Sequence, residues 1–208
     1  MTDRCAPKII FDHKDYFILN KPAGWYSIPS RSPTPGELNL TSWIKSEMKQ
    51  EPWIVHRLDR FTSGVILFAK SREAHREGNR WFAEKIAKKT YHFFASACAG
   101  SALPGRPAVQ LKTPIDGKPS QTLFEVIQTK PHFFYGKATP LTGRFHQIRE
   151  HAQQGHFPLL GDARYGFDAS VAGTDFHRVA LHAYELTLPL GTFHAELPKD
   201  MRDKLNEE

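Results

Sequence analysis

The sequence is poor in cysteine and has no long apolar run. Its 208 residues include two cysteines, Cys5 and Cys98, too few for a disulfide framework or a four-cysteine zinc site, so we expect two free thiols. The longest apolar stretch, Val65–Ala69, is too short to cross a bilayer, and the start MTDRCAPK lacks the apolar core of a signal peptide. We therefore expect a cytoplasmic protein with no membrane span.

The common signatures of catalytic and cofactor sites are also missing. The sequence contains no HExxH, CxxC, GxSxG, GxxxxGK[ST] or GxGxxG, and the eleven histidines lie outside the HxE plus PCxxC pattern of zinc deaminases. These absences argue against metalloproteases, common serine hydrolases, P-loop enzymes and dinucleotide-binding enzymes. We expect no metal and no organic cofactor, so any chemistry has to come from side chains.

What the chain does contain is an ordinary globular composition with a basic balance. Hydrophobic residues make up 40% and charged residues 24%, which favours one compact folded unit over a disordered or fibrous chain. The formal net charge is +6 and the isoelectric point is about 9.3, which favours an anionic partner such as nucleic acid. Charge alone is weak support, because many basic proteins bind no nucleic acid.

Strands outnumber helices in the predicted pattern. Apolar, aromatic or β-branched stretches predict strands within 11–20 and at 65–69, 90–97, 121–128, 133–138, 180–188 and 192–196. Helices are predicted at 40–47, at 72–89 after an N-cap at Ser71, at 143–154 and, briefly, near the C-terminus. Strands and helices do not alternate strictly, so we predict an α+β fold with a mixed sheet.

The predicted helix 72–89 has a basic outer surface. Ala74, Trp81, Phe82 and Ile86 share one face at helical spacing, and arginines and lysines occupy most of the rest. This charged face is equally compatible with solvent and with RNA.

The stretch VHRLDRFTSG, 55–64, places one carboxylate, Asp59, between Arg57 and Arg60, just before the apolar run. A nearby arginine favours the ionised form of a carboxylate, which would suit a nucleophile. Alternatively, Asp59 caps a turn by bonding the amides around Thr62 and Ser63.

A second dense stretch, LTGRFHQIREHAQQGHFPLLGDARYG, covers 141–166. Thr142 could cap a helix whose first turn carries Arg144, and Arg149 would then lie about 140° further around the axis. Ile148, one turn after Arg144, could present an apolar surface beside it. Alternatively, Phe145, Ile148 and Ala152 form only the core-facing stripe of a helix.

These two stretches resemble the motifs HRLDxxTSG, TGRxHQIRxH and GDxxYG of the RluA-type pseudouridine synthase family, here at 56–64, 142–151 and 161–166. The resemblance continues in NKPAGW, KKTYHFFA, DGKPSQT, RVALHAYEL and ELPKDM, in the family's order and over most of the chain. It implies a single catalytic domain, 1–208, with a mainly antiparallel mixed sheet, flanking helices and a central catalytic cleft. It also implies isomerisation of uridine to pseudouridine in structured ribosomal or transfer RNA, without metal or cofactor.

The resemblance also implies roles for individual residues. Asp59 matches the catalytic aspartate, which meets an electron-poor sugar centre much as a glycosidase carboxylate does. Arg144 would pair with Asp59 and keep it ionised, and Tyr91 matches the tyrosine that packs on the uracil.

Further residues are expected to contact the substrate. Ile148 would line the other side of the base, Arg57 would fill the space that a flipped uridine leaves, and Arg60 would contact a phosphate. Lys21 and Lys118 are candidates for contacts to the RNA backbone. His56, Thr62 and Ser63 are expected to brace the loop and take no part in the chemistry.

The chain begins too close to NKPAGW to hold the N-terminal RNA-binding domain of many relatives, so we expect recognition by the catalytic domain of a monomer. The segment CAGSALPGRPAVQ is short and irregular, and PLGTFHAE lacks an expected His-Pro, which leaves specificity open. An alternative from another class is an RNA-binding or RNA-folding protein whose catalysis is secondary or lost.

Overall fold

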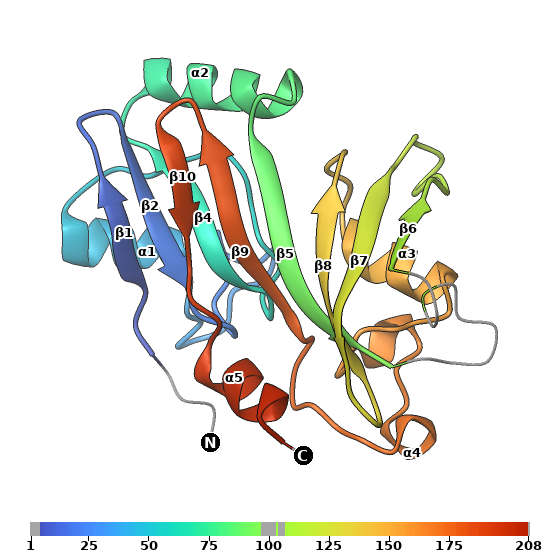
Figure 1. Cartoon of the computed structure of the whole chain (residues 1–208). Coiled ribbons are helices and arrows are strands. Elements are labelled where there is room, and N and C mark those ends of the chain that lie inside the picture. The colour runs from blue at the N-terminus through green and yellow to red at the C-terminus, as the bar shows by residue number, and fades with distance from the viewer. Residues whose placement is uncertain (1–4, 97–102, 104–106, 208) are drawn as a thin grey trace. The chain divides into compact units, whose positions relative to one another are not determined.

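A computed structural model describes residues 5–96, 103 and 107–207 (Figure 1). The chain divides into two compact units. Unit 1 comprises Met1–Lys88 and Ala183–Glu196, and unit 2 comprises Lys89–His182 and Leu197–Glu208. The Asp59 motif lies in unit 1 and the Arg144 motif in unit 2.

Unit 1 is built on neighbouring strands in the order β1-β2-β4-β9, which Figure 1 labels. Strand β10 pairs with β9, and the short strand β3 pairs with β4. The pairs β1–β2, β2–β4, β3–β4 and β9–β10 are antiparallel. The bounds of these strands are β1 Lys8–Asp12, β2 Tyr16–Lys21, β3 Trp53–Ile54, β4 Ser63–Ala69, β9 Leu181–Leu188 and β10 Gly191–His194.

Strand β4 is the buried centre of this sheet, because every residue from Ser63 to Ala69 is buried. The continuous apolar run 65–69 predicted this strand correctly. On one side of it lies helix α2 (Arg72–Ala83), and an apolar cluster fills the space between them. Most members of this cluster come from β2, β4, α2 and β9, among them Ile18, Leu67, Trp81 and Leu186.

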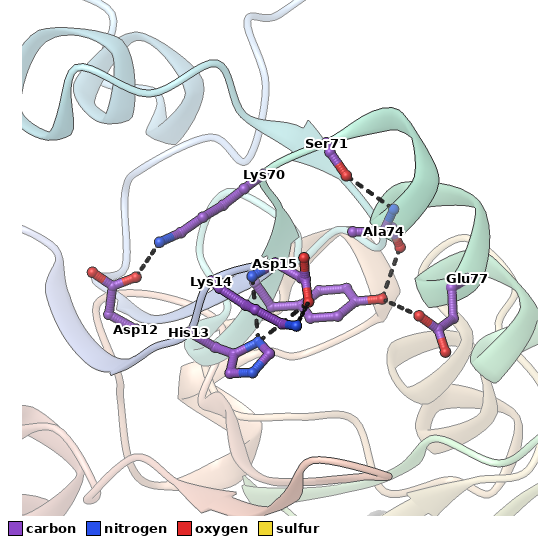
Figure 2. A network of polar contacts seen from close by, with 9 residues as sticks. Asp12, His13, Lys14, Asp15, Lys70, Ser71, Ala74 and Glu77 are labelled. Atoms are coloured by element: carbon purple, nitrogen blue, oxygen red, sulfur yellow. Dashed lines mark hydrogen bonds and ion pairs between the residues drawn. The ribbon is translucent and has the colours of Figure 1, made fainter.

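A polar network fastens the β1–β2 turn to the start of α2 (Figure 2). The hydroxyl of Tyr16 donates to the carbonyl of Ala74 at 3.0 Å and to Glu77 Oε2 at 3.1 Å. Burial, followed by the hydrogen bond and charge of Glu77, raises the pKa of Tyr16, so the phenol stays a donor. Ser71 caps the helix, as predicted, by accepting from the amide of Ala74 at 3.1 Å.

The remaining helical segment of unit 1 begins at a polar cap. Asn39 accepts from the amide of Ser42 at 2.9 Å and starts α1 (Leu40–Trp43), which continues as the π-helical turn η1 (Ile44–Met48). Leu40 and Ile44 are fully buried and anchor the segment. The predicted helix 40–47 is therefore present as these two pieces.

Unit 2 contains a second set of antiparallel strands in the order β5-β8-β7-β6. Their bounds are β5 Lys88–Ala95, β6 Ala108–Leu111, β7 Thr122–Thr129 and β8 Phe134–Pro140. Helical segments accompany them: α3 Gln147–Gln154, η2 Ala163–Tyr165, α4 Ala169–Ala172 and α5 Lys199–Leu205. A cluster of buried, mostly aromatic residues forms a hydrophobic core in unit 2, and it includes Phe94, Phe133, Phe176 and the aliphatic Met201.

Two helix boundaries differ from those predicted. Helix α2 ends at Ala83, well before 89, because Lys85 adopts a left-handed backbone with φ of 59°. Ile86, expected on the apolar face, is consequently 43% exposed. Helix α3 begins at Gln147, several residues after the predicted start at 143, and Thr142 does not cap it. Strand β6 was not predicted from the sequence.

In the part of the chain that the structure describes, no helix is long and apolar enough to cross a membrane. Within the same residues, no group of three or more histidine, cysteine, aspartate or glutamate side chains is arranged to hold a metal ion. Cys5 is an exposed free thiol, whereas Cys98 and most of CAGSALPGRPAVQ lie outside the described residues.

Candidate active site

Asp59 lies in a tight turn directly before the central strand of unit 1. Its carbonyl accepts from the amide of Thr62 at 3.1 Å, and the residue itself is partly exposed. Thr62 and Ser63 are buried and lead into β4. The main chain of Asp59 therefore forms the turn, and the carboxylate is carried at the end of a rigid strand.

Two side chains brace the residues around this turn. Ser27 Oγ donates to the carbonyl of Leu58 at 2.8 Å and accepts from its amide at 3.0 Å, so it holds the residue before Asp59 from both sides. His56 Nε2 accepts from the amide of Leu67 at 3.0 Å, and its ring stacks on Phe82. These contacts agree with the bracing role predicted for His56.

The two arginines beside Asp59 are both exposed, as contacts with RNA require. Arg60 is held by the loop that follows β2: its Nε donates to the carbonyl of Gly24 at 3.3 Å, and its guanidinium lies over the rings of Tyr26 and Phe61. Its own carbonyl accepts from the amide of Gly24 at 2.9 Å. The Asp59 turn and this loop are thus tied together.

Lys21 does not have the exposure that a contact with RNA backbone needs. The residue is fully buried at the end of β2, and its ammonium group donates to the carbonyls of Pro22 at 3.0 Å, Trp25 at 2.8 Å and Arg60 at 3.1 Å. These bonds offset the loss of hydration of a buried cation. In place of the predicted contact with RNA, the lysine fixes the loop after β2 to the Asp59 turn.

In unit 2, the TGR turn is organised by Gln147, a residue that the sequence did not single out. Its Oε1 accepts from Thr142 Oγ1 at 2.6 Å and from the amide of Arg144 at 3.0 Å. Its Nε2 donates to the carbonyl of Gln121 and to Thr122 Oγ1, both at 2.9 Å. The buried carboxamide therefore sets the backbone position of Arg144 relative to β7.

The guanidinium of Arg144 is exposed and donates twice, through Nε and Nη2, to the carbonyl of Pro119 at 3.2 Å. Pro119 follows Lys118, which pairs with Ile115 across a two-residue hairpin turn whose residues, Asp116 and Gly117, have φ of 50° and 69°. This is the backbone that a DG turn favours. Arg144 and the exposed Lys118 are thereby brought to the same region of unit 2.

Tyr91 and Ile148 are both largely buried, at 8% and 6% exposure. Tyr91 lies on β5 opposite Ala138 of β8, and Ile148 lies in the first turn of α3. Lys89, which precedes Tyr91 by two residues and so shares its face of the strand, was not predicted as a site residue. A Cβ on Gly143 of the TGR turn would lie 3.7 Å from Lys89 Nζ, and burial lowers the pKa of this lysine.

A second connection missed by the sequence reasoning joins the motifs TGRxHQIRxH and GDxxYG. Arg149 donates through Nε and Nη2 to the two carboxylate oxygens of Asp162, each at 2.7 Å, and both residues are buried. His146 Nδ1 and the hydroxyl of Tyr165 lie 3.1 Å apart. Arg149 is thus directed to a carboxylate 13 residues later. The predicted angle of about 140° between Arg144 and Arg149 does not apply, because Arg144 precedes α3.

Phe145 is 55% exposed, so the alternative that it belongs to the core-facing stripe of a helix is wrong. It precedes α3, and only Ile148 and Ala152 of the three proposed stripe residues are buried.

The predicted site residues are divided between the two units. Unit 1 holds Lys21, Arg57, Asp59 and Arg60, and unit 2 holds Tyr91, Lys118, Arg144 and Ile148. The pairing of Asp59 with Arg144 stays a prediction.

The family model for RNA pseudouridylate synthase matches residues 15–154, which span both motifs around Asp59 and Arg144. The chain belongs to this family. Ribosomal large subunit pseudouridine synthase C of Vibrio vulnificus (strain CMCP6) is 34% identical over 186 residues, which cover 84% of this chain and 59% of the relative. Dual-specificity RNA pseudouridine synthase RluA of the same strain is 34% identical over 197 residues, covering 86% of this chain and 76% of the relative.

The synthase C of Escherichia coli (strain K12) is 33% identical and is covered to 61% of its length, so the chain spans about 60% of these C-type relatives. Two human solved structures share the fold. RNA pseudouridylate synthase domain containing 1 has a TM-score of 0.77 at 22% identity, with 97% of this chain and 86% of that chain covered. Domain containing 4 has a TM-score of 0.74 at 20% identity, with 95% and 91% covered. The predicted α+β pseudouridine synthase fold is confirmed.

Proposed function

We propose that this protein is an RNA pseudouridine synthase that isomerises uridine in structured ribosomal or transfer RNA. The observation that carries the proposal is the HRLD turn, where Asp59 stands partly exposed at the head of the buried strand β4, with Leu58 fixed by Ser27. A carboxylate on so rigid a support is suited to meet a reacting sugar carbon. The relatives named as ribosomal large subunit pseudouridine synthases support ribosomal RNA as a substrate class, and the relative named as a dual-specificity enzyme supports more than one kind of RNA substrate.

The reaction needs no net addition of atoms. The bond between uracil N1 and the sugar C1′ breaks, the base turns, and C5 bonds to the same C1′, while the C5 proton is lost and N1 takes up a proton. We propose that Asp59 stabilises the electron-poor C1′ or attacks it, and that Tyr91 packs on the uracil and helps to remove the ring proton.

The remaining roles follow the same proposal. Arg144 keeps Asp59 ionised, and Ile148 lines the base. Arg57 fills the space of the flipped nucleotide, and the exposed Arg60 and Lys118 contact the RNA backbone. We also propose that residues 1–208 form a single catalytic domain with a central catalytic cleft. We further propose a cytoplasmic protein that acts as a monomer.

The test is to incubate wild type, Asp59→Asn and Asp168→Asn with unmodified ribosomal and transfer RNA and to quantify pseudouridine chromatographically after digestion. Asp168→Asn is the matched control, because Asp168 is an exposed helix cap outside the motifs and asparagine caps equally well. We expect pseudouridine with wild type and the control but not with Asp59→Asn, which should still bind RNA. RNA binding without pseudouridine in any sample would favour the alternative of an RNA-binding protein.

A further inference from the structure

The TGR motif carries an exposed aromatic ring next to its arginine. Phe145 is 55% exposed and directly follows Arg144, which is also exposed. Exposed apolar side chains are common on folded proteins, so exposure alone indicates nothing. What distinguishes Phe145 is that one face of its ring is already stacked: its centroid lies 3.7 Å from that of His146, with the two planes 21° apart.

The imidazole under Phe145 is held at both of its nitrogens. Nδ1 of His146 lies 3.1 Å from the hydroxyl of Tyr165, and Nε2 lies 3.0 Å from Nη1 of Arg149. Arg149 is in turn fixed by its two bonds to the buried carboxylate of Asp162. The support of the Phe145 ring is therefore a rigid side-chain network, and the ring is positioned before any ligand arrives.

An exposed, rigidly supported ring beside an arginine has the features of a nucleobase platform. Unpaired bases stack on aromatic side chains. The basic net charge of +6 favours a nucleic acid over an apolar protein partner. The turn that carries Phe145 also carries Arg144, so a base stacked there would lie close to the target nucleotide.

We propose that the exposed face of Phe145 stacks on an unpaired base of the RNA substrate that neighbours the target uridine. The inference rests on the proposed function and adds a binding subsite to it. Because the ring holds a neighbour and takes no part in bond breaking, its loss weakens substrate binding and leaves the chemical step in place.

The test compares Phe145→Ser, which removes the ring, with Phe145→Trp, which keeps an aromatic face. Ile127→Ser is the matched control, because Ile127 is 53% exposed on β7 of the same unit but lies outside the motifs. The probe is a fluorescently labelled, uridine-containing RNA stem-loop. The measured quantities are Kd for this RNA and KM and kcat for pseudouridine formation. We expect Phe145→Ser to raise Kd and KM about 5-fold or more, with kcat within about 2-fold, and Phe145→Trp and Ile127→Ser to match wild type.

An unchanged Kd in Phe145→Ser would overturn the stacking proposal. A Phe145→Trp variant that binds the RNA as weakly as Phe145→Ser would overturn it as well. A fall in kcat at constant Kd would overturn it too, since the ring would then act on the reaction itself. Absence of pseudouridine with wild type would refute the proposed function, while the Kd comparison would still decide whether Phe145 stacks on RNA. The two failures are therefore distinguishable.

Discussion

At the scale of single residues, the candidate catalytic groups are positioned by buried polar side chains that are fully engaged. Ser27 holds the backbone before Asp59, and Gln147 holds that of Arg144. Neither supporting residue reacts, yet each has several hydrogen bonds to satisfy, and a buried polar group that loses its partner is costly. The geometry of the site thus depends on uncharged side chains as well as on the buried ammonium of Lys21.

The buried pair Arg149–Asp162 gives a prediction at this scale. Replacing Arg149 by methionine leaves the carboxylate of Asp162, which is 1% exposed, without its bidentate partner. The free energy of unfolding should fall by about 3–5 kcal/mol. Urea denaturation measures this, with Arg164→Met as the control, because Arg164 is exposed on the neighbouring segment. A loss of under about 1 kcal/mol would show that the pair does not fasten the two motifs.

At the scale of elements, the glycine of the TSG motif sets how closely two strands approach. Gly64 has φ of 113°, and a Cβ there would lie 2.1 Å from the carbonyl oxygen of Ala183 on β9. Gly64→Ala should therefore lower the free energy of unfolding by roughly 3 kcal/mol.

Gly36 provides the comparison, since its φ of 79° is also positive but no atom would lie within 4 Å of a Cβ. Gly36→Ala should lower the free energy of unfolding by only about 1 kcal/mol, which is the cost of holding a residue with a Cβ at positive φ. Denaturation of both variants separates the clash from the backbone effect. Equal losses in the two would contradict the close approach of β4 and β9.

Elements whose signals are local were predictable from the sequence. The run 65–69 and the cap at Ser71 were identified because continuous apolar residues and cap chemistry act over a few neighbours. The end of α2 was missed because Lys85 adopts a left-handed backbone that lysine does not signal. The start of α3 was missed because the Gln147 carboxamide bonds to β7 and holds 143–146 as a turn.

The same distinction applies to the candidate site. Motif resemblance predicted which residues to consider, and their exposure supports Arg57, Arg60 and Lys118. It did not predict the burial of Lys21, because its ammonium donates not only to the nearby carbonyls of Pro22 and Trp25 but also to that of Arg60, 39 residues away. Long-range contacts of this kind leave no local pattern.

At the scale of the whole molecule, stability should depend on pH through His92. Burial, and then the charge of Lys137, lowers the pKa of His92 from 6.5 to about 4. Between these two values the unfolded chain binds a proton that the folded chain does not, so the free energy of unfolding should decrease as pH falls from 6.5 to 4. His92→Asn removes this group, and its stability should decline less over that range.

Chemical denaturation at several pH values gives the free energy of unfolding of wild type and of His92→Asn as a function of pH. His132→Asn in the same unit is the control for the change of side chain. His132 is exposed, whereas His92 lies on β5 and bonds to the hydroxyl of Tyr135. Parallel curves for wild type and His92→Asn would exclude His92 as the source of the dependence.

The central claim concerns the reaction itself, and it is tested most directly by following the hydrogen on uracil C5. An RNA labelled with tritium at C5 of uridine should release tritium into water when wild-type protein forms the new carbon–carbon bond, one tritium for each pseudouridine. Asp59→Asn should release none. An RNA that the wild-type protein binds but from which no tritium is released would contradict the account.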